Sequence, residues 1–185
     1  MLALVDLCYA RLARGDPGAR QTGESALARA LEAYNGSHTH PNVLKARVAR
    51  AQALAAHGEL EFAIAETSRA IDDAAALFSP SARVVGVDLL RLARLQLRAG
   101  HFQSALASAD RAKKILAEYL DPSAAGYGSL LEVRGAALLQ AGRFQEALVD
   151  LSEAEQLLRN AYGPAHPSAA RLRELRLSAA SSAKR

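Results

Sequence analysis

Three arginines at helical spacing are the residues of this sequence best suited to binding chemistry. Arg91, Arg94 and Arg98 stand at i, i+3 and i+7, which places three guanidinium groups on one face of a helix. Arginine captures carboxylate and phosphate groups through paired hydrogen bonds, so we predict a basic surface that takes an acidic or phosphorylated peptide. In the alternative interpretation, acids such as Asp88 and Glu132 neutralise the arginines within the protein.

The sequence carries none of the common catalytic or cofactor-binding motifs. It has no Gly-rich phosphate loop, no Gly-x-Ser-x-Gly elbow, no His-Glu-x-x-His and no pair of cysteines. A metal site built from His38, His40 and a carboxylate is one interpretation of the histidines, and solvated histidines in turns are the favoured one. We therefore expect no enzyme activity, no catalytic residue, no cofactor and no bound metal.

Composition favours a helical protein and argues against nucleic acid as its partner. The 185 residues include 42 Ala and 29 Leu, against five Tyr, four Phe and no Trp, which excludes an all-β fold. The net charge of +4 is weak beside the clustered charge of nucleic-acid-binding proteins.

No apolar run approaches the ~20 residues of a membrane span, and the N-terminal residues lack the basic region of a signal peptide. The single cysteine, Cys8, suits a reducing compartment, so we expect a cytoplasmic protein.

The elements that must position these side chains form an internal repeat of 42 residues. The matching residues are Gly58, Gly100 and Gly142; Pro80, Pro122 and Pro164; and the alanine pairs Ala63 and Ala70, Ala105 and Ala112, Ala147 and Ala154. We predict that the glycines are left-handed residues in the turn inside a helical hairpin. The prolines are predicted to open the next hairpin at the first helical position. The alanines are predicted to line a seam where two helices approach closely.

The repeat predicts a series of helices separated by these turns. We expect helices at about 1–14, 23–35, 41–57, 59–78, 81–99, 101–119, 123–141, 143–161 and 165–180, with a long loop at 15–23. The corresponding domains are an irregular N-terminal hairpin at 1–35, three repeats at 36–164, a capping helix at 165–180 and a frayed tail at 181–185.

The repeat unit resembles the tetratricopeptide repeat (TPR), in which small residues stand at the eighth, twentieth and twenty-seventh positions. Those positions hold Ala51, Ala63 and Ala70, then Ala93, Ala105 and Ala112, then Gly135, Ala147 and Ala154. The 42-residue length is similar to that of the kinesin light chain variety of the repeat. A Gly-Pro-x-His-Pro junction at 163–167, with Pro41 three periods before Pro167, is a second similarity to that variety.

This resemblance implies an all-α, right-handed superhelix of antiparallel helix hairpins, a TPR-like α-solenoid. It implies a non-catalytic scaffold that binds a peptide or a partner protein in its concave groove. The groove positions of the repeat hold Lys45, Gln52, Arg91, Arg94, Arg98, Glu132, Gln140 and Arg171. The alternative function is a regulatory or sensor fragment of a bacterial signalling protein, either a Ser/Thr kinase or a transcription regulator.

The N-terminal helix supports a second class of function, self-assembly. Apolar side chains surround most of its circumference, namely Leu2, Leu4, Val5, Leu7, Cys8 and Leu12. The first helix of a solenoid would expose part of this surface. We predict that this end either dimerises or packs on a further domain, whereas the many charges at 168–177 predict a polar cap at the other end.

Overall fold

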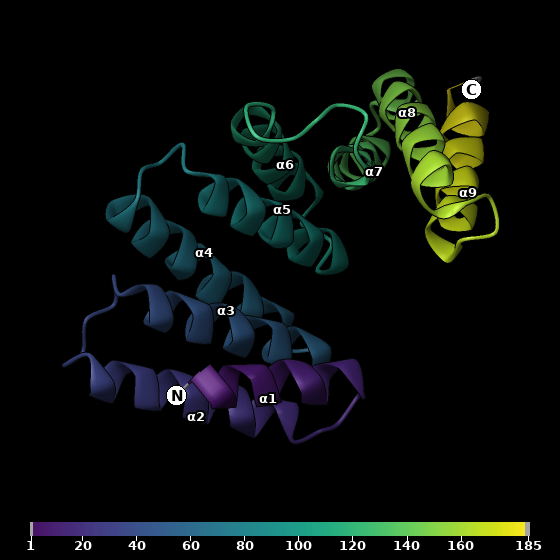
Figure 1. Cartoon of the computed structure of the whole chain (residues 1–185). Helices are drawn as coiled ribbons and strands as arrows, with labels where there is room; N and C mark the ends of the chain where they lie inside the picture. Colours follow the sequence, from purple (N-terminus) through teal and green to yellow (C-terminus); the bar gives the residue numbers. More distant parts are fainter. Residues whose placement is uncertain (1, 184–185) are drawn as a thin grey trace. The chain divides into compact units, whose positions relative to one another are not determined.

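The computed structural model describes residues 2–183, and every regular element within them is an α-helix. The helices are α1 (Leu2–Ala13), α2 (Ala19–Ala33), α3 (Pro41–Ala56), α4 (Leu60–Leu77), α5 (Arg83–Arg98), α6 (Phe102–Leu116), α7 (Ala125–Gln140), α8 (Phe144–Tyr162) and α9 (Pro167–Ser182). Successive helices turn back on one another as hairpins (Figure 1). Each predicted helix is present, and all predicted ends except the start of α2 agree within three residues.

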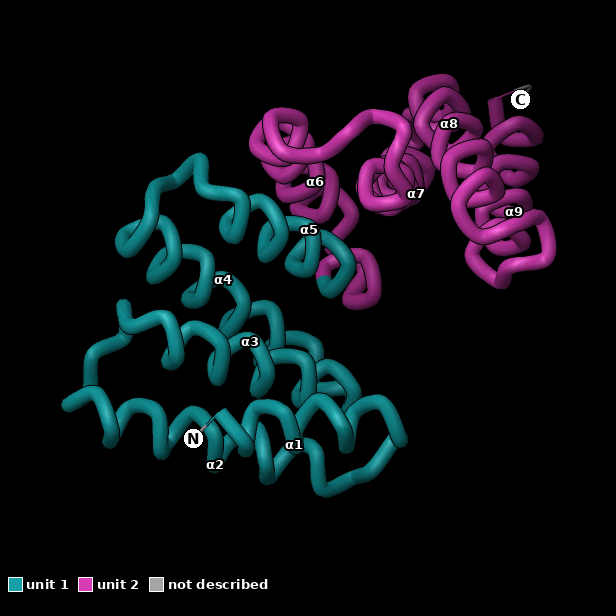
Figure 2. The backbone as a smooth tube through the Cα atoms, viewed as in Figure 1, with its two compact units in different colours: residues 1–95 teal, residues 96–185 magenta. Residues whose placement is uncertain are grey.

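The chain divides into two compact units, residues 1–95 (unit 1) and residues 96–185 (unit 2), with the boundary inside α5 (Figure 2). In unit 1, α2 packs against α1 and α3, and α3 also packs against α1 and α4. In unit 2, α7 packs against α6 and α8, and α9 packs against α8 and α7. Most of these contacts therefore join helices that follow one another in sequence, and α1 with α3 and α7 with α9 are next-but-one pairs, as expected of helical repeats.

The turn inside each later hairpin is built on a left-handed glycine, as predicted. Gly58, Gly100 and Gly142 have φ angles of 80°, 81° and 78°. The residue after each glycine donates its N–H to a carbonyl near the end of the preceding helix, at 3.0, 2.8 and 2.9 Å. This hydrogen bond satisfies a carbonyl that the helix itself leaves unpaired.

The first hairpin is tighter than its sequence predicts. Because α2 begins at Ala19, the predicted long loop at 15–23 is wrong. Gly15 takes the left-handed conformation, with φ 65°, and Asp16 donates its N–H to the Arg11 carbonyl at 2.9 Å, so the turn is the same as in the later hairpins. Gly23 lies inside α2, where a Cβ atom would come within 3.0 Å of the Arg50 Cα. That glycine permits close helix contact rather than a turn.

The prolines of the 42-residue series lie before the helices instead of opening them. Pro80, Pro122 and Pro164 each lie in a loop, three residues before α5, α7 and α9 begin. The prediction that they hold the first helical position is therefore wrong. Pro41 and Pro167 hold that position, at the starts of α3 and α9. Proline suits it because a helix leaves the first backbone N–H groups unpaired in any case.

Small and aliphatic side chains make the core of each unit. The six alanines of the predicted seam are all 0% exposed, which confirms that the second helix of each hairpin packs through them. Val5, Cys8 and Val43 belong to the unit 1 core, and Leu151 and Leu172 belong to the unit 2 core. At the C-terminus, α9 includes residues 181 and 182 of the predicted tail, and residues 184–185 lie outside the described part of the chain.

Candidate functional site

Unit 1 contains a largely apolar pocket of about 210 Å³. It is lined by Tyr9 from α1, by Pro41, Leu44, Lys45 and Val48 from α3, by Phe78 at the end of α4, and by Val84, Asp88 and Arg91 from α5. Tyr9, Phe78 and Val84 are 36%, 53% and 37% exposed, which is unusual for large apolar side chains that lie together. We call this site the unit 1 pocket.

The charges of the unit 1 pocket are unbalanced toward positive. The Asp88 carboxylate is buried and forms an ion pair with Arg91 one turn later on α5. Burial raises the pKa of Asp88, although the nearby Arg91 charge acts in the opposite direction. Burial likewise raises the pKa of Tyr9, and Arg91 again opposes the shift. Lys45 is exposed and makes no ion pair within residues 2–183, so the pocket holds one cation more than it holds carboxylates.

The predicted site residues of unit 1 lie on two helices. Lys45 and Arg91 come together in the unit 1 pocket. Gln52 lies on α3 two turns after Lys45 and is half-buried, and Arg94 follows Arg91 on the exposed face of α5. Arg98, the last residue of α5, is also exposed and belongs to unit 2.

Two of the predicted site residues of unit 2 bind each other. Arg171 of α9 donates a hydrogen bond to the Glu132 carboxylate of α7. Glu132 is buried and Arg171 is exposed. The buried Glu132 carboxylate of α7 therefore has the Arg171 guanidinium of α9 as its cationic partner. Gln140 is exposed at the end of α7. Asp88 and Glu132 are the two acids that could neutralise arginines within the protein. Asp88 forms an ion pair with Arg91, and Glu132 forms one with Arg171.

Buried ion pairs connect the two helices of a hairpin in both units. In unit 1 the Glu66 carboxylate accepts hydrogen bonds from Arg47 and Arg50, each at 2.5 Å. In unit 2 Asp150 accepts one from Arg134 at 2.6 Å. Arg50 and Arg134 are two periods apart, and so are Glu66 and Asp150. These pairs fix the hairpins on which the surface residues are placed.

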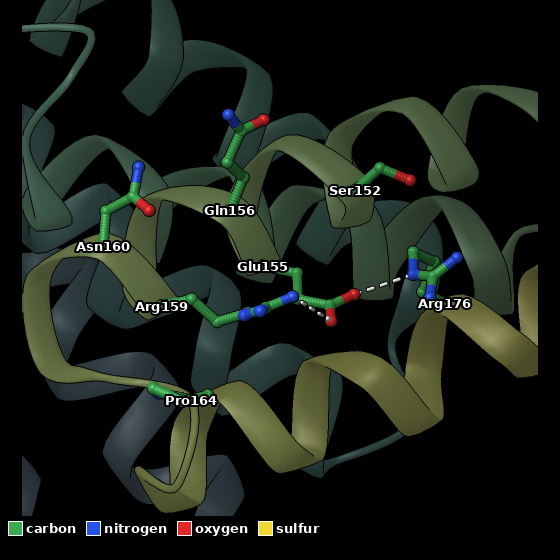
Figure 3. Close-up of a pocket in the computed structure, with 7 residues that line it drawn as sticks. All are labelled: Ser152, Glu155, Gln156, Arg159, Asn160, Pro164 and Arg176. Atoms are coloured by element: carbon green, nitrogen blue, oxygen red, sulfur yellow. Dashed lines mark hydrogen bonds and ion pairs between the residues drawn. The ribbon is translucent and has the colours of Figure 1, made fainter.

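A second hollow lies in unit 2 between α8 and α9. It consists of two adjoining parts of about 610 and 740 Å³, which share Glu155, Arg159, Pro164 and Arg176. Figure 3 shows Arg159 and Arg176 extending toward Glu155 from α8 and α9. The Arg176 Nε donates to the Glu155 carboxylate at 2.7 Å, and the Arg159 Nη1 lies 3.9 Å from it. We call this site the α8–α9 groove.

The histidines have structural contacts. His38 Nδ1 lies 2.7 Å from the Arg47 guanidinium. His40 Nδ1 accepts the Asn42 N–H at 3.2 Å and His166 Nδ1 accepts the Ser168 N–H at 3.3 Å, so both residues cap the N-terminus of a helix. Within residues 2–183, no three side chains of His, Cys, Asp or Glu lie close enough to hold a metal ion together.

Sequence reasoning named Lys45 and Arg91, which both line the unit 1 pocket, and it missed the apolar walls of that pocket and the whole α8–α9 groove. The helical spacing of Leu44 with Val48 on α3 was a usable signal for the pocket wall. Glu155 and Arg159 stand at i and i+4, a spacing that predicts a surface ion pair and nothing more specific. Neither signal identifies the second helix that completes the site.

Comparison with known proteins gives matches among solved structures. A kinesin light chain-type protein of Podosopora anserina with nearly identical TPR-like repeats matches with a TM-score of 0.80 and 18% identity, over 98% of this chain and 86% of that one. A single-residue variant of it matches with a TM-score of 0.81 and 18% identity, over 98% and 85%. BtubC (BKLC) from P. vanneervenii matches with a TM-score of 0.70 and 24% identity, over 86% of this chain and 62% of that one. This chain has the TPR-like repeat fold of kinesin light chains. No protein-family model and no curated protein sequence matches it.

The TPR-like fold confirms the predicted all-α solenoid and the predicted resemblance. Within the described part of the chain, none of the TPR-like helices combines the length and the apolar character that crossing a bilayer requires.

Proposed function

We propose that this chain is a non-catalytic interaction module that holds a peptide segment of a partner protein in the unit 1 pocket. The supporting observation is that one pocket combines exposed apolar walls with the Lys45 ammonium and the Arg91 guanidinium. An apolar side chain of the partner fills the pocket, and an adjacent acidic or phosphorylated residue binds the two cations.

The charge state of the pocket supports an anionic partner. Arg91 donates to Asp88 through Nη1 alone, so its Nε and Nη2 donors are available to a ligand within hydrogen-bond reach. Lys45 has no competing carboxylate among the described residues. A carboxylate of the partner therefore gains two cationic partners, Lys45 and Arg91. The negative charge of Asp88 repels any second anionic group of the partner from the apolar wall of the pocket.

The remaining predicted site residues lie in both units. In unit 1, Gln52 and Arg94 continue from the pocket on α3 and α5. In unit 2, Arg98, Gln140 and the Glu132–Arg171 pair offer further polar contacts. We propose that Gln52 and Arg94 make further polar contacts with a partner held in the unit 1 pocket.

A selection from a library of random displayed peptides tests the proposal. We expect the enriched peptides to carry an apolar residue beside Asp, Glu or a phosphorylated residue. Lys45→Gln should weaken the selected peptides by about tenfold, because it removes one charge-assisted contact. The double variant Arg91→Gln with Asp88→Asn should do the same without leaving a buried carboxylate unpaired.

Arg29→Gln is the matched control. Arg29 is an exposed arginine on α2 of the same unit and does not line the pocket, so this change alters the net charge equally. Equal weakening by Arg29→Gln and Lys45→Gln would attribute binding to general charge and contradict the proposal.

Self-association through α1 is a second candidate function, supported by a separate observation. Leu2 and Leu7 are 49% and 42% exposed on this helix. We propose that two copies bury these side chains against each other. Sedimentation at several concentrations should show a dimer that Leu7→Glu abolishes, and a strict monomer at high concentration would refute it.

A further inference from the structure

The α8–α9 groove of unit 2 contains more hydrogen-bond donors than its own acids use. Three arginines line it, Arg159, Arg173 and Arg176, against two carboxylates, Glu155 and Glu174. Arg176 donates to Glu155 through Nε only. Within residues 2–183, neither Arg159 nor Arg173 donates a side-chain hydrogen bond. The groove therefore presents an excess of positive charge with unfilled guanidinium donors.

Glu155 gives the groove a fixed arrangement. Its side chain is only 12% exposed, and one carboxylate oxygen accepts the Arg176 N–H from the neighbouring helix at 2.7 Å. The other oxygen lies 3.9 Å from Arg159, one turn later on the same helix. Two guanidinium groups thus lie near one carboxylate (Figure 3), and the hydrogen bond fixes that of Arg176, which lowers the entropy that a ligand must remove when it binds this group.

A further set of side chains on α8 is suited to a peptide. Gln156 and Asn160 stand one turn apart on α8 and line one part of the groove. Their amides, which both donate and accept, extend from the side of α8 that faces away from Glu155 and Arg159 (Figure 3). A backbone segment presents alternating N–H and C=O groups, which amides can pair with. A free inorganic anion would use the arginines and leave these amides unused.

We propose that the α8–α9 groove binds a phosphorylated side chain of a partner protein, with Arg159, Arg173 and Arg176 on the phosphate and the α8 amides on the adjacent backbone. A phosphate monoester carries up to two negative charges and three acceptor oxygens. Three guanidinium groups can supply donors to all three oxygens, even though Arg176 already uses its Nε–H on Glu155. A single carboxylate would leave most of these donors unfilled. This site is separate from the unit 1 pocket, so failure of one proposal leaves the other standing.

Nuclear magnetic resonance titration of the whole chain tests the proposal. The probes are a short uncharged peptide with one phosphoserine, the same peptide with serine, and inorganic phosphate. We expect the phosphopeptide to shift the amide signals of 152–160 and 170–177, and to bind at least about tenfold more tightly than either other probe.

Variants then locate the contacts. Arg159→Gln combined with Arg173→Gln should weaken the phosphopeptide by about tenfold or more, since both guanidinium groups are exposed and their loss leaves the core intact. The matched charge control is Arg111→Gln combined with Lys114→Gln, which also removes two exposed cations from α6 of the same unit. This control should change binding by less than about twofold. Circular dichroism should show equal helix content in all variants.

Three results would overturn the proposal. Equal binding of the serine peptide would show that the phosphate is not recognised. Equal binding of inorganic phosphate would assign the groove to the free anion. Equal weakening by the control that combines Arg111→Gln with Lys114→Gln would show that the net charge of the protein, and not the groove, attracts the probe.

Discussion

The Arg134 guanidinium of α7 donates a hydrogen bond to the Asp150 carboxylate of α8, with 2.6 Å between Nη1 and Oδ2. Asp150 is 4% exposed, so the contact is an ion pair between two helices inside one hairpin. One period earlier, the same two positions hold Leu92 and Ser108. The hairpin therefore tolerates either a charged pair or a pair without charge, provided that both positions change together.

Removal of one partner of this ion pair should destabilise unit 2. Asp150→Ala leaves Arg134 half-buried with only the exposed Asp110 as a partner, and we expect a loss of about 2 kcal/mol in the free energy of unfolding. Arg134→Leu combined with Asp150→Ala should lose only about 1 kcal/mol, because no charge remains unpaired. Urea unfolding of the single and double variants measures both values, and additive losses would contradict this account.

The buried Asp88 predicts a specific dependence of stability on pH. Burial raises the pKa of Asp88 in the folded protein, so the folded state binds this proton more tightly than the unfolded state does. The unfolding free energy of the parent, relative to Asp88→Asn, should therefore rise as the pH falls from 7 toward about 4, the ordinary range of an aspartate. Urea unfolding of both proteins across this range checks the sign. A relative stability that falls with the pH would refute the prediction.

Two glycines of α7 should respond to alanine in opposite ways. A Cβ at Gly135 would lie 2.7 Å from the Leu151 Cγ, so Gly135→Ala should destabilise the protein by about 1–3 kcal/mol through overpacking. The nearest atom to a Cβ at Gly126 is the Leu120 Cδ2, at 3.5 Å. Gly126→Ala should therefore be neutral or stabilise by up to about 1 kcal/mol through helix propensity. Thermal unfolding compares the two, and equal effects would show that the close contact at Gly135 is not limiting.

Cys8 should be unreactive until the first hairpin opens. Its side chain is 0% exposed, its Sγ lies 3.5 Å from the Ala19 carbonyl oxygen, and burial raises the pKa of the thiol. A thiol reagent needs an accessible thiolate, so labelling in native buffer should be slow and should accelerate with denaturant. Rapid labelling of the native protein would show that α1 separates readily from α2.

Local steric requirements explain which parts of the fold could be predicted from sequence. Gly58 and its counterparts must adopt positive φ in a tight turn, which favours glycine. Ala63 and its counterparts must leave room for a neighbouring helix, which favours a small side chain. Both requirements can therefore be recognised from the residue type in the sequence. Gly23 shows the limit, since a glycine in a turn and a glycine under a crossing helix look identical in sequence. Only the contact with Arg50 separates the two roles.

The candidate sites show more strongly that contacts between separate helices cannot be predicted from the sequence. Arg91 was predicted from spacing within one helix, and Lys45 from the resemblance to a known repeat. Tyr9 and Phe78 reach the same pocket from α1 and α4, and no spacing within either helix indicates this. The α8–α9 groove depends on Arg176 crossing to Glu155 over a distance of 21 residues in sequence. Side chains that meet only through packing of separate helices are not visible before the fold is known.

The neighbour-to-neighbour packing within each unit has a consequence for how the chain folds. Helices such as α7 contact partners that are close in sequence, so little chain entropy is lost when the first contacts form. Folding of such an array is expected to be rapid and to begin at more than one hairpin.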